Sequence, residues 1–189
     1  MRDQSVGEFL EQLAARVSAP GGGATAALHA ALSAALLGMV ARYSDGPKYD
    51  EHAPVITAVL ADADALRTEA LQLAEDDAAA FTAVTDAYKL PKGPERSAAI
   101  AEALAGAAIP PQRTIAVAGR LVALAEALLP IGNRNVITDV AAAADAARAA
   151  ATTARVNVEI NGAAVESDVD ALTARADQVT ARVRKEIAR

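Results

Sequence analysis

Cysteine and tryptophan are absent from this 189-residue chain, and aromatic residues make up only 3% of it. Without cysteine the protein forms neither disulfides nor thiolate intermediates, and two histidines alone give a structural zinc site too few of its usual ligands. We therefore expect no metal. Alanine carries most of the 53% hydrophobic fraction. This composition predicts a core of closely spaced helices rather than layers of bulky side chains.

Basic residues are fewer than acidic ones, and the net charge of -6 comes without any basic stripe that would neutralise phosphates. Residues 1–4 lead straight into an amphipathic segment, with no apolar secretory sequence. The apolar run 24–41 is nearly long enough to cross a bilayer, but it includes Thr25, His29 and Ser33 and lacks aromatic anchors at both of its ends. We expect a cytoplasmic protein that binds neither nucleic acid nor membrane.

Helix signals follow one another along the chain with little room for strands. Ser5 and Glu8 form a capping box, and apolar residues then recur every three or four positions. Proline and glycine turn signals separate the later segments. The expected helices cover residues 6–17, 24–44, 54–89, 94–110, 111–129, 138–157 and 168–187. The sequence predicts an all-α fold, one antiparallel helical bundle over residues 1–189.

The alanine-dense helices expected at 24–44 and 138–157 are apolar nearly all round, so we place them at the centre or at a subunit contact. Alanine contacts bury little area, and each Å² contributes only about 25 cal/mol. Apolar surface left uncovered by one short bundle favours a homodimer.

A glycine loop stands immediately before the first alanine-dense helix. Pro20 is followed by Gly21, Gly22 and Gly23. A backbone without Cβ atoms comes close to a ligand, and free N–H groups of a helix N-terminus attract an anion or a polar ligand edge. The same loop also suits two helices that pack tightly, so the motif alone leaves both interpretations open.

One carboxylate falls within an apolar seam. Leu73, Asp77, Phe81, Val84 and Tyr88 follow one another every three or four residues. Burial raises the pKa of a carboxyl group, which suits a general acid or base near neutral pH. Asp77 is therefore a candidate catalytic residue; the alternative is a structural carboxylate that pairs with an arginine or caps a neighbouring helix.

Other polar residues stand near expected helix ends. Asp139 begins the second alanine-dense helix, Asn133 precedes it in a loop, and Asn157 and Asn161 close it. Residues at such places more often satisfy backbone groups than bind a ligand. His29, alone among alanines, is expected to be a hydrogen-bonded core residue.

Five segments together carry a resemblance to a known family: PGGG at 20–23, DAAAF at 77–81, KLPK at 89–92, GN with TD at 132–139, and NVEIN at 157–161. In this order they resemble the cyclodeaminase/cyclohydrolase family. It includes the cyclodeaminase domain of formiminotransferase-cyclodeaminase and stand-alone bacterial methenyltetrahydrofolate cyclohydrolases. The resemblance extends from about Ser5 to Asp170. It implies an all-helical, usually dimeric fold with a folate site and no metal.

The resemblance also implies a chemistry and a set of site residues. The substrate would be a tetrahydrofolate derivative, with no other cofactor, and one carbon would be cyclised or hydrolysed between two folate nitrogens. Asp77 and Asp139 would be catalytic. The residues expected to bind substrate are Pro20, Gly21, Gly22, Gly23, Asn133, Asn157 and Asn161, with Lys48, Lys89 and Lys92 near the glutamate tail.

Three positions depart from the family pattern. Ala24 stands where the family usually has serine, Thr138 replaces the serine before the aspartate, and His29 occupies a place usually held by a small residue. Two alternatives therefore stay open: a repurposed member that opens or closes a ring on a non-folate substrate, and a non-catalytic helical binding dimer.

Overall fold

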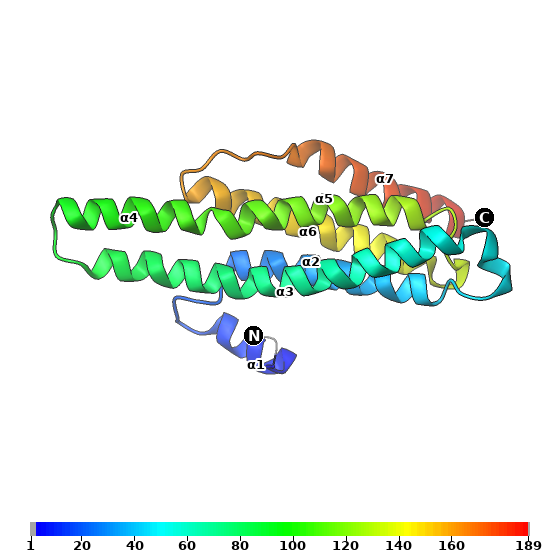
Figure 1. Cartoon of the computed structure of the whole chain (residues 1–189), viewed down its shortest axis with the longest axis horizontal. Helices are drawn as coiled ribbons and strands as arrows, with labels where there is room; N and C mark the ends of the chain where they lie inside the picture. The colour runs from blue at the N-terminus through cyan, green and yellow to red at the C-terminus, as the bar shows by residue number, and fades with distance from the viewer. Residues whose placement is uncertain (1–2, 189) are drawn as a thin grey trace.

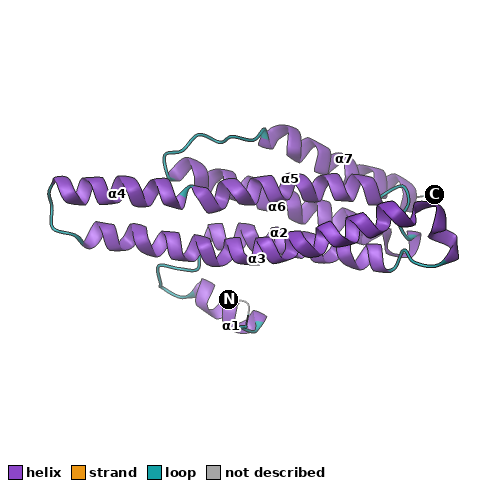
Figure 2. Ribbon diagram, in the orientation of Figure 1, coloured by secondary structure: helices purple, strands orange, loops and turns teal. Residues whose placement is uncertain are grey.

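A computed structural model describes residues 3–188, and within them the chain is helical with no strand (Figure 2). The α-helices are α1 (Val6–Ala14), α2 (Gly22–Arg42), α3 (Ala53–Lys89), α4 (Pro94–Ala107), α5 (Ile109–Leu128), α6 (Ile137–Ile160) and α7 (Val169–Ile187). Short 3-10 turns at Pro47–His52 and Arg134–Val136 precede α3 and α6. The all-α prediction is confirmed.

Several helix boundaries differ from the sequence prediction; α1, for example, ends at Ala14 instead of Val17. The break expected at Pro110 lies instead between Ala107 and Ile109, and both prolines belong to the first turn of α5. Proline fits there because the first turn needs no N–H donor. Gly22 and Gly23 join α2 instead of preceding it, so the glycines form the first turn of that helix.

The alanine-rich helix α2 runs through the centre of the bundle and packs against α3, α6 and α5. Ser33 is fully buried, and its hydroxyl donates a 2.8 Å hydrogen bond to the Ala143 carbonyl of α6. Small side chains let the two helices approach this closely. Among residues 3–188, α2 alone is apolar and long enough to cross a membrane, but 61% of its apolar window is buried, as in a core helix.

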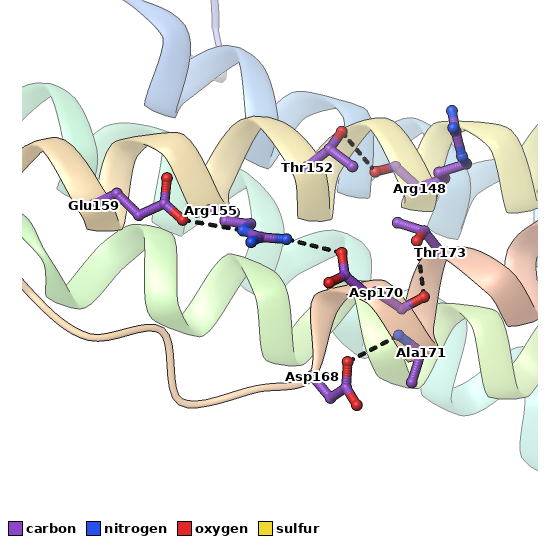
Figure 3. A network of polar contacts seen from close by, with 8 residues as sticks. All are labelled: Arg148, Thr152, Arg155, Glu159, Asp168, Asp170, Ala171 and Thr173. Atoms are coloured by element: carbon purple, nitrogen blue, oxygen red, sulfur yellow. Dashed lines mark hydrogen bonds and ion pairs between the residues drawn. The ribbon is translucent and has the colours of Figure 1, made fainter.

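Helix α7 covers α6 and α5 on the side away from α1 (Figure 1). Its start is fixed by polar contacts shown in Figure 3. The Asp168 carboxylate caps the helix by accepting from the Ala171 N–H at 2.9 Å. Arg155 of α6 bridges Glu159 at 3.0 Å and Asp170 at 2.8 Å. These contacts hold α7 beside the C-terminal half of α6, the half that carries Asn157.

The second half of α3 pairs with α4 in a hairpin that projects past the start of α2 (Figure 1). The sequence predicts one buried seam of Leu73, Phe81, Val84 and Tyr88. The prediction is right for two of these residues and wrong for the other two. Leu73 and Val84 are buried, whereas Phe81 and Tyr88 are 45% and 51% exposed. Beyond the start of α2, the hairpin has no central helix to cover that side.

Candidate active site at the base of the hairpin

A cavity of about 180 Å³ opens where the start of α2, the middle of α3, the α4–α5 junction and the end of α6 meet. It is lined by Ser18, Ala19, Gly21, Gly22, Gly23, Asp77, Phe81, Ala107, Asn157, Ile160 and Asn161. The structure therefore brings together the glycine loop, Asp77 and both C-terminal asparagines, which the sequence singled out separately.

Asp77 lies directly against Gly23. A Cβ atom at position 23 would lie 2.0 Å from Asp77 Oδ1 and 2.4 Å from its Cγ, far inside any allowed contact. The backbone N–H of Ala24 donates a hydrogen bond to the same carboxylate. Asp77 thus caps the first turn of α2, and glycine at 23 leaves the room that this approach needs.

Burial raises the pKa of Asp77 above its usual value, and the hydrogen bond from Ala24 opposes part of that rise. The positive end of the α2 dipole acts in the same direction as Ala24. The carboxylate is therefore a better proton acceptor than a solvated aspartate, while the helix start keeps its ionised form accessible. This balance suits a group that accepts and returns a proton in each turnover.

Two asparagine side chains, Asn157 on the last turn of α6 and Asn161 at its C-cap, form the facing wall. Asn157 Nδ2 donates to the Thr153 carbonyl at 2.8 Å, and Asn161 Nδ2 donates to the Ala107 carbonyl at 3.0 Å. Asn161 thereby ties the end of α6 to the α4–α5 junction. Within residues 3–188 the carboxamide oxygen of Asn157 has no hydrogen-bond partner, so it is free to meet a ligand donor.

The mouth of the cavity is apolar. Phe81 is 45% exposed and Ile160 is 78% exposed, and both side chains line the opening. Large apolar side chains left open beside a cavity that holds a carboxylate and two carboxamides are typical of ligand sites, where they cover a flat apolar ring.

Asp139 does not reach this cavity within the chain. It lies on the first turn of α6, 18 residues before Asn157 (157 − 139), which is about 27 Å along the helix. The expectation that Asp77 and Asp139 share one site is thus not met inside a single chain. The reason is topological, because the two residues fall at opposite ends of the bundle.

Asn133 lies at the same far end and has a structural role there. Its backbone N–H donates to Ser44 Oγ at 2.8 Å, and its Nδ2 donates to the Tyr43 carbonyl at 2.7 Å. Its Oδ1 accepts from the Asn135 N–H at 3.0 Å. Asn133 therefore joins the loop after α2 to the loop before α6, away from Asp77.

The three lysines predicted near a glutamate tail are also divided between the two ends. Lys48 lies over the Tyr49 ring, 5.4 Å from its centroid, at the end opposite the cavity. Lys89 and Lys92 lie at the tip of the hairpin, and Lys89 pairs with Asp86 at 2.7 Å. Lys89 follows Asp77 by 12 residues (89 − 77), or about 18 Å along α3.

Known proteins are similar to this chain in both fold and sequence. The family model for formiminotransferase-cyclodeaminase matches residues 5–181. The chain belongs to this family. A crystal structure of formiminotetrahydrofolate cyclodeaminase from Thermotoga maritima superposes with a TM-score of 0.83 at 28% sequence identity, over 97% of this chain and 96% of that one.

Two curated relatives differ in how much of their length the chain covers. A methenyltetrahydrofolate cyclohydrolase from Methylorubrum extorquens is 36% identical over 165 residues, which are 84% of this chain and 79% of that protein. The formimidoyltransferase-cyclodeaminase of Mus musculus is 33% identical over 173 residues, 88% of this chain but only 32% of the mouse protein. The chain thus spans about a third of the mouse protein.

Sequence reasoning missed some of the lining residues in this family member. Ser18 and Ala19 directly precede Pro20, and their place in the motif was the available signal. Ile160 lies between the two asparagines. The spacing of Phe81 predicts a core residue, but Phe81 lies one helical turn after Asp77 on the same face of α3 and lines the cavity with it.

The structure shows the surroundings of two residues that depart from the family pattern, Ala24 and His29. Ala24 is fully buried, and its backbone N–H, rather than its side chain, meets Asp77. His29 is partly exposed on α2, and its buried Nδ1 has no hydrogen-bond partner in the described chain. The expectation of a hydrogen-bonded core histidine is therefore wrong.

Across residues 3–188, no three His, Cys, Asp or Glu side chains gather closely enough to hold a metal ion. A metal-free reaction stays a prediction that the activity assay below tests.

Proposed function

We propose that this chain is a folate one-carbon enzyme that opens the methenyl bridge of 5,10-methenyltetrahydrofolate, as a cyclohydrolase. The similarity to the Methylorubrum cyclohydrolase, which the chain matches over most of both lengths, supports this reaction. The observation that carries it is the partly buried Asp77 carboxylate, held against Gly23 by the Ala24 N–H at the floor of a cavity with an apolar mouth.

The reaction follows from the charge of the substrate. The methenyl carbon shares a positive charge with two folate nitrogens, so the ionised Asp77 attracts it, and binding lowers the pKa of the carboxyl group. Water then attacks that carbon while Asp77 accepts a proton, and a neutral tetrahedral carbinol forms.

Collapse of the carbinol completes the turnover. The bond from carbon to the ring nitrogen breaks, that nitrogen keeps the electron pair, and Asp77 returns its proton to it. The carbinol hydroxyl loses its proton to Asp77 and then to solvent as the formyl C=O forms. The products are 10-formyltetrahydrofolate and one proton, which balances the cationic substrate and water.

The cavity walls fit the rest of the substrate. Phe81 and Ile160 offer apolar surface to a flat ring, and the Asn157 carboxamide oxygen accepts from a ring N–H. An extended tail leaving the mouth along α3 approaches Lys89 and Lys92, whose charges match its carboxylates. The methenyl cation at one end of the ligand and the tail carboxylates at the other meet opposite charges of the protein, so the ligand binds in one orientation.

A second candidate is the cyclodeaminase reaction, which the names of the Thermotoga and mouse proteins favour. Here the anilino nitrogen attacks the carbon of the protonated formimino group (=NH2⁺), Asp77 takes the proton of the anilino nitrogen and returns it to the former imino nitrogen, and ammonia leaves to give the methenyl cation. The same carbon becomes tetrahedral, so one carboxylate serves both reactions.

The test compares both reactions with one preparation. Loss of the methenyl absorbance measures cyclohydrolase turnover, and its appearance from the formimino compound measures cyclodeaminase turnover. A higher kcat/KM for the first supports the proposal, and a higher value for the second selects the alternative. Binding of tetrahydrofolate without either turnover indicates a binding protein, and no binding indicates another substrate. A chelator should leave the rates unchanged.

We also propose that the enzyme is a cytoplasmic homodimer. The outer face of α2 carries Thr25, Leu28, Leu32, Leu36 and Met39, of which Leu32 is 58% exposed. Between Gly22 and Met39 no Asp, Glu, Lys or Arg occurs. Two copies with a net charge of -6 repel each other, so an uncharged apolar face is the surface where they meet most favourably. Sedimentation at micromolar concentration checks this.

A further inference from the structure

The first helix is built to fold but has little to fold against. Ser5 and Glu8 form a complete capping box, with the Ser5 N–H donating to the Glu8 carboxylate at 2.7 Å and the Glu8 N–H donating to Ser5 Oγ at 3.2 Å. Helix α1 has 9 residues. A helix this short is unstable in water alone and depends on packing of its apolar face.

That apolar face is uncovered in the single chain. None of the residues of α1 is buried, and Val6, Leu10 and the following Val17 are 76%, 54% and 57% exposed. Figure 1 shows α1 standing away from the bundle, on the side opposite α7. Phe9 and Leu13 complete the same face and are partly exposed.

A second copy of this chain is the occupant that fits. Residues 15–21 join α1 directly to the start of α2, so any partner bound to the uncharged outer face of α2 comes within reach of α1, which we call the arm. In a two-fold dimer each copy supplies one arm and one outer face of α2, so every arm has one face to pack on. A membrane fits poorly, because the polar side of α1 carries Glu8 and Glu11 and no basic residue.

The segment that joins α1 to α2 also forms part of the cavity wall. Ser18, Ala19 and Gly21 line it, yet among residues 3–188 no hydrogen bond joins residues 15–20 to the bundle. We propose that α1 is an exchanged arm, which packs its apolar face on a second copy and thereby fixes the cavity wall formed by residues 18–21. This inference rests on the homodimer proposed above.

A matched pair of variants tests it. Leu10→Glu places a charge on the apolar face of α1, and Gln12→Glu places the same side chain on its exposed polar side. Leu10→Glu should raise the dimer dissociation constant at least about tenfold, as loss of an interface anchor does. It should raise KM while kcat stays, because the reacting groups are untouched. Gln12→Glu should change neither, and circular dichroism confirms that both variants keep the bundle.

Hydrogen exchange locates the arm directly. In the wild type, protection of the α1 amides should rise with the dimer fraction, and in Leu10→Glu it should be lost while the bundle amides stay protected. Equal protection in monomer and dimer places the arm on its own bundle and overturns the proposal. Protection gained only on adding phosphatidylcholine–phosphatidylglycerol vesicles overturns it too, as does a Leu10→Glu dissociation constant equal to that of the wild type.

The outcomes separate the proposals. A wild type that sediments as a monomer refutes the homodimer and the arm together. A stable dimer with unprotected α1 amides refutes the arm alone. Neither result touches the folate reaction, which the absorbance assay measures independently.

Discussion

Replacement of Gly23 by alanine is the sharpest perturbation that this site offers. The added Cβ would lie 2.0 Å from Asp77 Oδ1, and ordinary contact begins at 3.4 Å. The carboxylate must therefore retreat by about 1.4 Å (3.4 − 2.0). A misplacement of about 1 Å costs on the order of 10² in rate, so kcat should fall at least that far.

Gly22→Ala is the matched control, because it adds the same methyl group one residue earlier in the same helix turn. Its Cβ would lie 3.6 Å from Asn157 Nδ2, an ordinary contact. Asp77 keeps its place, so any effect should fall on KM and leave kcat near the wild-type value. Both variants gain helix propensity, up to about 1 kcal/mol, so propensity does not explain a difference between them.

Stability gives a second measurement of the same contact. Overpacking should lower the free energy of unfolding of Gly23→Ala by about 1–3 kcal/mol. In an Asp77→Ala background the clash is gone, so Gly23→Ala should then be neutral or stabilising. Thermal melts of the four proteins and single-turnover rates check both effects. A Gly23→Ala enzyme with wild-type kcat, or a cost that persists without the carboxylate, would refute the packing of Asp77 on Gly23.

Further predictions concern Asp77 and the supporting hydrogen bonds. Asp77→Asn keeps the acceptor for Ala24 but removes the base, so kcat should fall about 10²–10⁴-fold with the fold intact. Burial raises the folded-state pKa of Asp77, so its charge lowers the free energy of unfolding once the pH exceeds the ordinary value of 3.8. Asp77→Asn should therefore be more stable than the wild type at pH 7. Thermal melts across pH should show that this gain disappears below pH 3.8. For the same reason kcat/KM should decline with falling pH at a midpoint above 3.8, and an unperturbed midpoint in the pH–rate profile would contradict this. Ser33→Ala removes the buried bond to Ala143 and should cost about 1 kcal/mol in denaturant unfolding without changing kcat.

Local patterns in the sequence determine much of this protein. The capping box predicted at Ser5 appears in the structure, and Pro54 in the first turn of α3 and the Asp168 cap of α7 likewise act within a few residues. Spacing also placed Asp77 on the face of α3 that turns inward. The family resemblance was likewise readable, because its motifs are short segments whose order along the chain survives without any knowledge of the fold.

Only the tertiary structure decided which of these segments meet. Gly23 and Asp77 are 54 positions apart (77 − 23), and no periodicity signals that their contact forbids a Cβ. Asp139 and Asn157 share one helix, yet the length of that helix sends them to opposite ends of the bundle. Phe81 reads as core because its spacing is right, but it is exposed because α3 outruns α2. Spacing reports which face of a helix a residue occupies, whereas the neighbours of that face depend on how long the other helices are and where they end.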